Sequence, residues 1–140
     1  MATIAMEPCA SFRATSVRDE RSKLLRSIRP MTADEVRQNA VAGQYGPARI
    51  GGNDVPGFRQ EGGVDANSQT DTYAAATFFV DNWRWAGVPF YVRTGKRLAK
   101  RVSEIAIQFN TAPLHLFGQD SGNASANLLI LRIQIGRAYV

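Results

Sequence analysis

The pattern of apolar and polar residues changes along the chain from a helical period to a period of two. Among the first 30 residues, Val17, Leu24, Leu25 and Ile28 fall on one stripe of a helix. Further on, apolar and polar residues alternate within 88–93 and 102–109, which is typical of strands with one buried face. Helices followed by strands predict an α+β fold, an antiparallel sheet with helices on one side.

Two helix starts are predicted by capping residues. Ser16 with Asp19 three residues later predicts an N-cap, and Pro30 ends the helix that follows. Thr32 with Glu35 three residues later forms a capping-box pattern and predicts a short helix to about residue 38. The apolar start, residues 1–6, needs other residues to pack on, since an apolar segment at a free terminus is otherwise exposed to water.

Four strands are expected in the remainder, after a short extended piece at 39–45. Residues 70–80 fit a helix or a strand by pattern, because three alanines favour the first and the threonines and aromatic residues favour the second. Clearer strands are predicted at 88–93, 102–109 and 127–134. Residues 49–69 and 111–126 are expected to be loops, and the first is either a surface excursion or a functional loop.

Composition narrows the class of protein. A chain of 140 residues has one-domain length, and its net charge of +5 and pI near 9.9 suit an anionic ligand. The cations are spread along the chain, so a nucleic-acid partner is not expected. One cysteine, Cys9, indicates a reducing compartment. The start does not resemble a signal peptide and no apolar run approaches the roughly 18 residues that span a bilayer. We therefore expect a cytoplasmic protein without a membrane partner.

A basic turn follows the strand predicted at 88–93. Gly95 is followed by Lys96, Arg97, Lys100 and Arg101. Cations on a loop that a glycine opens, just past a strand end, suit an anionic small molecule such as a phosphate ester. By spacing alone a solvated basic turn is the favoured interpretation, and an anion site is the alternative.

The amino-acid sequence of this segment resembles that of a known family. The run WRWAGVPFYVRTGKRLAKR, residues 83–101, is similar to the central part of glucose-6-phosphate dehydrogenases. The likeness extends to SVRDERSKLLRSIRP at 16–30, GQYG at 43–46 and NLLILRIQ at 127–134. Residues 1–134 thus resemble part of the family's C-terminal domain, in a larger two-domain enzyme, and 70–80 is expected to be a strand. Residues 135–140 are interpreted as a divergent tail.

The resemblance implies an NADP-dependent glucose-6-phosphate 1-dehydrogenase of the pentose phosphate pathway. In that family the residues matching Lys96 and Arg101 contact the phosphate of glucose 6-phosphate, and the glutamine matching Gln134 reaches the substrate. Arg132 would lie near the ligand region. For Arg132 and Gln134, a strand end that merely emerges into solvent is an equal alternative.

Catalytic and cofactor residues are not expected within the chain. It holds no GxGxxG turn, so the dinucleotide-binding domain is predicted to be absent. By the resemblance, the catalytic histidine would precede Met1, and the sole histidine, His115, is interpreted as structural. One His and one Cys cannot form a metal site. We expect the 140-residue polypeptide to be inactive and homo-oligomers to require the full-length enzyme. The alternative is a non-catalytic anion-binding or interaction module.

Overall fold

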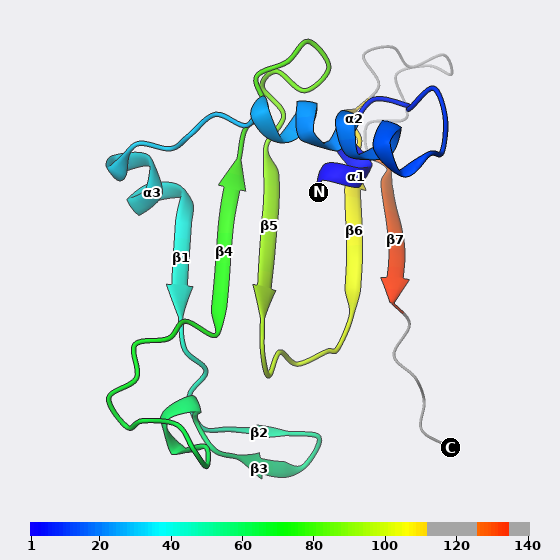
Figure 1. Ribbon diagram of the computed structural model, residues 1–140. Coiled ribbons are helices and arrows are strands. Elements are labelled where there is room, and N and C mark those ends of the chain that lie inside the picture. The colour runs from blue at the N-terminus through cyan, green and yellow to red at the C-terminus, as the bar shows by residue number, and fades with distance from the viewer. Residues whose placement is uncertain (112–125, 135–140) are drawn as a thin grey trace, which may run out of the picture. The chain divides into compact units, whose positions relative to one another are not determined.

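The computed structural model describes residues 1–111 and 126–134 (Figure 1). The chain divides into two compact units. The first unit, Met1–Arg97, contains the α-helices and two sheets. The second, Leu98–Val140, contains a hairpin of two strands. The predicted α+β class is confirmed, although the strands of the described residues form three separate hydrogen-bonded sheets instead of one.

A three-stranded antiparallel sheet is the centre of the first unit. Its order is β1 (Ala40–Gly43), β4 (Tyr73–Phe78), β5 (Phe90–Gly95). The strand expected within 70–80 is therefore confirmed. β5 begins later than the predicted residue 88, because the Val88 amide closes a turn onto the Trp85 carbonyl at 3.0 Å and Pro89 has no N–H for the ladder.

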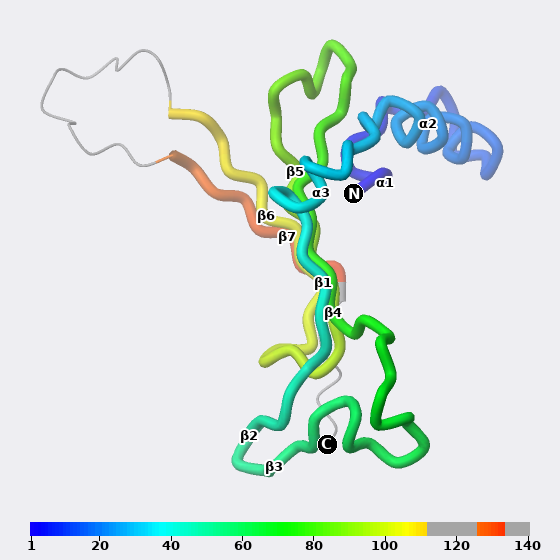
Figure 2. The backbone as a smooth tube through the Cα atoms, turned by 90° about the vertical axis from the view of Figure 1, so that its left-hand side faces the viewer, coloured from blue at the N-terminus to red at the C-terminus, as the bar shows by residue number. Residues whose placement is uncertain are grey.

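Three α-helices accompany this sheet: α1 (Ala2–Ala5), α2 (Ala14–Arg26) and α3 (Ala33–Asn39). Figure 2 shows α1 and α2 to one side of the sheet, as predicted. The prediction that Ser16 caps α2 is wrong, since Arg13 occupies the N-cap position and Ser16 lies inside the helix. The Ser16 hydroxyl instead lies 3.1 Å from the Ser11 hydroxyl, so it is not available to a free helix amide. α2 ends at Arg26, ahead of Pro30.

The capping box predicted for α3 is confirmed. The Glu35 amide donates to Thr32 Oγ1 at 3.3 Å, and the Thr32 amide donates to Glu35 Oε2 at 2.8 Å. The bond from the Thr32 amide favours the ionised carboxylate, so this amide first, and then the Thr32 hydroxyl and Arg29, lower the pKa of Glu35. The short helix thus depends on a reciprocal pair of exposed hydrogen bonds.

The hydrophobic core of the first unit is small and includes the apolar start of the chain. Among the described residues, the buried hydrophobic side chains are Ala5, Leu24 and Val80. Trp85 Nε1 donates to the Ala5 carbonyl at 2.8 Å. The Trp85 ring also packs edge-on against Phe90, with the ring centroids 5.2 Å apart. Residues 1–6 therefore find their packing partners within the chain, on α2 and on the segment that follows β4.

Residues 44–72 form an excursion beyond the Gly43 end of β1 (Figure 1). The expected loop at 49–69 is wrong in part, because β2 (Ala48–Ile50) pairs with β3 (Asn53–Val55), followed by a 3₁₀ turn, η1 (Phe58–Gln60). Gly51 and Gly52 join the two strands with φ of 59° and 85°. Positive φ at both central residues defines a type I′ hairpin turn, which glycine pairs favour.

The second unit holds the antiparallel hairpin of β6 (Ser103–Gln108) and β7 (Leu128–Gln134). Both strands confirm the sequence prediction. Ser103 faces Gln134 and Glu104 faces Arg132, with an irregularity between these two pairs. Most of the loop expected at 111–126, His115 and the tail at 135–140 lie outside the described residues.

None of the helices in residues 1–111 and 126–134 is long and apolar enough to cross a membrane.

Candidate functional site

Lys96 lies one residue past the end of β5, where the sheet holds its backbone but leaves its side chain exposed. Gly95 is paired with Tyr73, and the Lys96 amide donates to the Thr72 carbonyl at 2.9 Å. In the described part of the chain, no carboxylate forms an ion pair with Lys96. A fixed backbone with an unpaired ammonium group is suited to binding an anion from solution.

Arg97, the next residue, has a different environment. Its Nη2 lies 2.6 Å from Glu61 Oε1, which also accepts a hydrogen bond from the Tyr45 hydroxyl at 3.2 Å. The hydrogen bond to Glu61 first, and then Tyr45, raise the pKa of Arg97. Its φ of 56° is left-handed, a conformation that costs a residue with Cβ about 1–2 kcal/mol. The Arg97 guanidinium therefore forms an ion pair within the chain, whereas the Lys96 ammonium group forms none among the described residues.

Sequence reasoning did not find this pairing of Arg97 with Glu61. The two residues are 36 positions apart, and Glu61 lies in the excursion that was expected to be a loop. No periodic pattern joins a loop carboxylate to a turn cation at such a separation. A sequence signal existed only for the hairpin of the excursion, where Gly51 and Gly52 separate two short runs.

The root of the excursion is hydrogen-bonded to the residues beside the Lys96 turn. The Thr72 amide donates to the Gly43 carbonyl at 2.8 Å, and the Tyr45 amide donates to Thr72 Oγ1 at 3.0 Å. Gln44 Nε2 donates to the Ser68 and Thr70 carbonyls at 2.8 and 2.9 Å. Thr72 therefore joins both the start of the excursion and the amide of Lys96.

The other three predicted site residues lie at one end of the β6–β7 hairpin in the second unit. Arg101 precedes β6 by two residues, and Gln134 is opposite Ser103 in the register. Arg132 Nε lies 3.9 Å from Glu104 Oε2, with 70% of the Arg132 side chain exposed. The hairpin register thus brings the backbones of Arg101, Arg132 and Gln134 to one end, while Lys96 belongs to the first unit.

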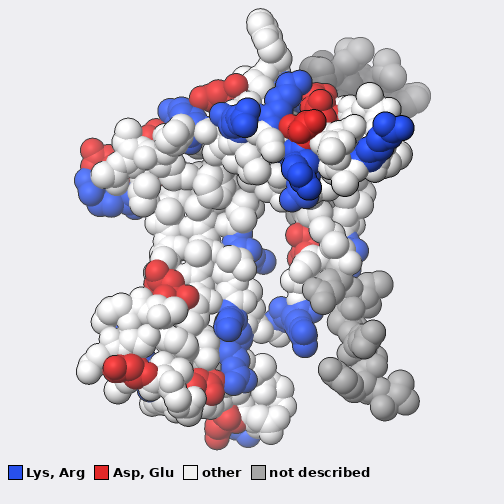
Figure 3. Space-filling model, viewed as in Figure 1, with Lys and Arg blue, Asp and Glu red and all other residues white. Residues whose placement is uncertain are grey.

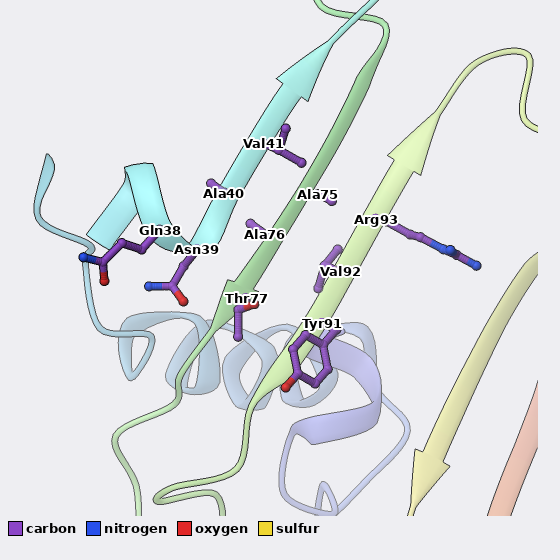
Figure 4. Close-up of a pocket in the computed structure, with 10 residues that line it drawn as sticks. All are labelled: Gln38, Asn39, Ala40, Val41, Ala75, Ala76, Thr77, Tyr91, Val92 and Arg93. Atoms are coloured by element: carbon purple, nitrogen blue, oxygen red, sulfur yellow. The ribbon is translucent and has the colours of Figure 1, made fainter. Parts of the chain in front are cut away.

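A shallow depression of about 460 Å³ lies elsewhere, on the face of the three-stranded sheet (Figure 4). Its lining is formed by the end of α3 and by all three strands and does not include Lys96. Arg93 is the one cation in this lining, and its side chain extends away from the sheet in Figure 4. The candidate phosphate site therefore rests on the turn after β5 and not on this depression.

Charges of both signs are mixed over α2 and do not define a separate site on that helix. On the face shown in Figure 3, Lys and Arg side chains over α2 are interspersed with Asp and Glu. Lys23 Nζ, for example, lies 3.8 Å from Glu20 Oε2 on this helix. Within residues 1–111 and 126–134, no three His, Cys, Asp or Glu side chains come together as a metal site requires.

The chain is similar to known proteins over almost its whole length. The family model described as glucose-6-phosphate dehydrogenase, C-terminal domain, matches residues 1–139. The glucose-6-phosphate 1-dehydrogenase of Aggregatibacter actinomycetemcomitans is 50% identical over 134 residues, which are 96% of this chain and 26% of that protein. The enzyme of Mycolicibacterium smegmatis is 44% identical over 131 residues, with the same 26% share of its length.

Solved structures agree with the sequence relatives. A glucose-6-phosphate dehydrogenase in complex with its substrate glucose-6-phosphate superposes with a TM-score of 0.76 at 34% identity, over 96% of this chain and 26% of that one. The crystal structure of glucose-6-phosphate 1-dehydrogenase from Mycobacterium avium gives 0.75 at 31% identity, over 95% and 26%. The chain spans about a quarter of the length of these relatives. It belongs to the glucose-6-phosphate dehydrogenase family and corresponds to part of the family's C-terminal domain.

Proposed function

We propose that this chain is the substrate-binding part of a cytoplasmic NADP-dependent glucose-6-phosphate 1-dehydrogenase of the pentose phosphate pathway. The complete enzyme oxidises C1 of glucose 6-phosphate to the 6-phosphogluconolactone, and NADP accepts the hydride. The match of the family's C-terminal domain to residues 1–139 carries this proposal. The structural neighbour with glucose 6-phosphate bound supports the choice of substrate.

Within this function, Lys96 and Arg101 bind the phosphate group of the substrate. An ammonium and a guanidinium group together offset the two negative charges of a phosphate dianion through charge-assisted hydrogen bonds. Gln134 is assigned to a substrate contact, and Arg132 to the border of the same region. Binding the phosphate anchors one end of the substrate and so restricts where the C1 hydroxyl at the other end can lie. This restriction favours reaction by orientation.

The described residues do not fit the cofactor. A dinucleotide pyrophosphate is held where a strand leads through a glycine turn into the N-terminus of an α-helix. In the described part of the chain all α-helices precede the strands, so no such arrangement occurs there. We therefore assign NADP to other parts of the complete enzyme, and we derive no step of hydride transfer from these residues. The homo-oligomer is likewise assigned to the complete enzyme.

A segment exchange tests the proposal. Residues 1–134 replace the matching segment of the Aggregatibacter actinomycetemcomitans enzyme, and reduction of NADP is followed by absorbance with glucose 6-phosphate or with glucose. We expect turnover that depends on glucose 6-phosphate and is much weaker with glucose. A folded exchange protein that binds NADP but turns over neither sugar would contradict the proposal. If such a protein still bound glucose 6-phosphate, the result would favour a non-catalytic anion-binding module.

A further inference from the structure

Lys96, the proposed phosphate ligand, is followed by a residue that is fixed to the excursion. We propose that the ion pair between Glu61 and Arg97, assisted by Tyr45, holds the turn that presents Lys96 to the sugar phosphate. Glu61, Arg97 and Tyr45, here called the turn clamp, are positioning residues and do not themselves touch the substrate. The inference rests on the proposed function for the role of Lys96, whereas the clamp itself is a property of the fold.

The backbone around Lys96 is anchored on both sides. Before it, the Lys96 amide donates to the Thr72 carbonyl at 2.9 Å. After it, the Arg97 guanidinium is joined to Glu61 Oε1 at 2.6 Å. The peptide that links Lys96 to Arg97 lies between these two anchors, so their loss frees the direction in which the Lys96 side chain leaves the turn.

The backbone of Arg97 has a left-handed conformation, which needs contacts that stabilise it. Its φ of 56° is unfavourable for a residue with Cβ, and among the described residues it is the one non-glycine with positive φ. Such a conformation persists where surrounding contacts stabilise it. The ion pair with Glu61 is the contact that the structure supplies there.

The other end of the clamp is itself held in place. The Tyr45 hydroxyl donates to Glu61 Oε1 at 3.2 Å, and the Tyr45 ring meets Phe58 edge-on at 5.7 Å. The Tyr45 amide donates to Thr72 Oγ1 at 3.0 Å. Thr72 is thus shared by both anchors of the turn, which couples the excursion to Lys96 through one residue of the sheet end.

Burial of the ion pair sets the size of the expected effect. The Glu61 side chain is 26% exposed and that of Arg97 is 46% exposed, so solvent screens the attraction in part. Ion pairs this exposed change an equilibrium constant by no more than about fivefold. We therefore expect loss of the clamp to raise KM for the sugar phosphate about two- to fivefold.

The kinetic test uses variants of the segment-exchange enzyme. Glu61→Gln, Arg97→Ala and their double variant should each raise KM for glucose 6-phosphate about two- to fivefold, with kcat and KM for NADP nearly unchanged. The double variant should be no worse than either single one, because each change removes the same pair. Arg97→Lys, which keeps the cation, should restore most of the affinity. Multiplied effects in the double variant would overturn the proposal.

Two further variants test whether loss of the ion pair, and not another effect of the substitutions, raises KM for the sugar phosphate. Arg97→Gly adopts positive φ without steric strain, so it should raise KM as Arg97→Ala does if the ion pair is what holds the turn. A parental KM in Arg97→Gly would overturn the proposal, since backbone preference alone would then suffice. Arg49→Ala is the matched control, because Arg49 pairs with Asp54 at 3.9 Å in the same excursion but away from the turn. It should leave KM unchanged.

Hydrogen exchange of the Lys96 amide tests the clamp without substrate. This amide should exchange faster in Glu61→Gln and Arg97→Ala and unchanged in Arg49→Ala, because only the first two release the turn. Unchanged exchange in all variants would overturn the proposal, and so would faster exchange with an unchanged KM for the sugar phosphate. Absence of turnover in the unsubstituted segment-exchange enzyme would contradict the proposed function instead. The hydrogen-exchange measurement would then decide on the turn clamp alone.

Discussion

Replacing Lys96 with alanine in the segment-exchange enzyme should weaken substrate binding without weakening the fold. The structural bond at this position is made by the Lys96 amide to the Thr72 carbonyl, which alanine keeps. The side chain is exposed, and within the described residues it forms no ion pair. We expect the free energy of unfolding to change by no more than about 0.5 kcal/mol, as for ordinary surface substitutions.

The effect on affinity should be much larger. A hydrogen bond to a charged group contributes about 1.5–3 kcal/mol, so loss of the phosphate contact should raise KM for glucose 6-phosphate about ten- to a hundredfold. KM for NADP should stay within about twofold, because the described residues do not fit the cofactor. Steady-state kinetics with each substrate varied, together with thermal unfolding, measure both quantities. An unchanged KM for glucose 6-phosphate in a stably folded Lys96→Ala protein would refute the assignment of Lys96.

Further predictions concern the 140-residue polypeptide. Alone, it should show no glucose 6-phosphate-dependent reduction of NADP, because its sequence holds no glycine-rich dinucleotide turn, and turnover in proportion to its concentration would contradict this. Its urea unfolding should be broad, and size-exclusion chromatography should show self-association. The reason is that its described residues bury few hydrophobic side chains and expose strand residues such as Ile133. A sharp unfolding transition from a monomer would oppose this expectation. The pKa of Glu35, followed by carboxyl NMR, should lie below 4.5 in the parent and rise in Thr32→Ala. Folding lowers this pKa, so the ionised Glu35 carboxylate adds to the free energy of unfolding above about pH 4.5. This contribution is lost as the pH falls through the pKa of Glu35 in the folded protein.

Local signals in the sequence predicted local structure well. Thr32 and Glu35 are three positions apart and predicted a capping box, which depends only on residues within one helical turn. Alternation in 102–109 predicted β6 for the same reason. Ser16 has the residue type of a cap, but its hydroxyl is adjacent to that of Ser11, and α2 begins earlier, at Ala14. A cap prediction fails where another polar group competes for the same side chain.

Features that join distant segments were beyond the sequence. The alternation of 88–93 predicted a strand with one buried face, yet Val92 of β5 is 36% exposed and Val88, ahead of the strand, is 39% exposed. Burial depends on what covers a strand. The Glu61–Arg97 pair likewise joins an excursion to a turn across 36 positions. Lys96 was found through the family resemblance, since the spacing of the basic turn alone favoured a solvated surface. Its assigned contact with phosphate stays a prediction.

The most direct test of the account is a crystal structure of the segment-exchange enzyme with glucose 6-phosphate bound. We predict Lys96 Nζ at about 2.7–2.9 Å from a phosphate oxygen, the usual length of a charge-assisted hydrogen bond, with the Arg101 guanidinium on the same phosphate. We also predict that the Arg97 guanidinium stays on Glu61 and does not reach the substrate. A phosphate group bound by other residues, with Lys96 directed into solvent, would contradict the central claim that this turn recognises the substrate.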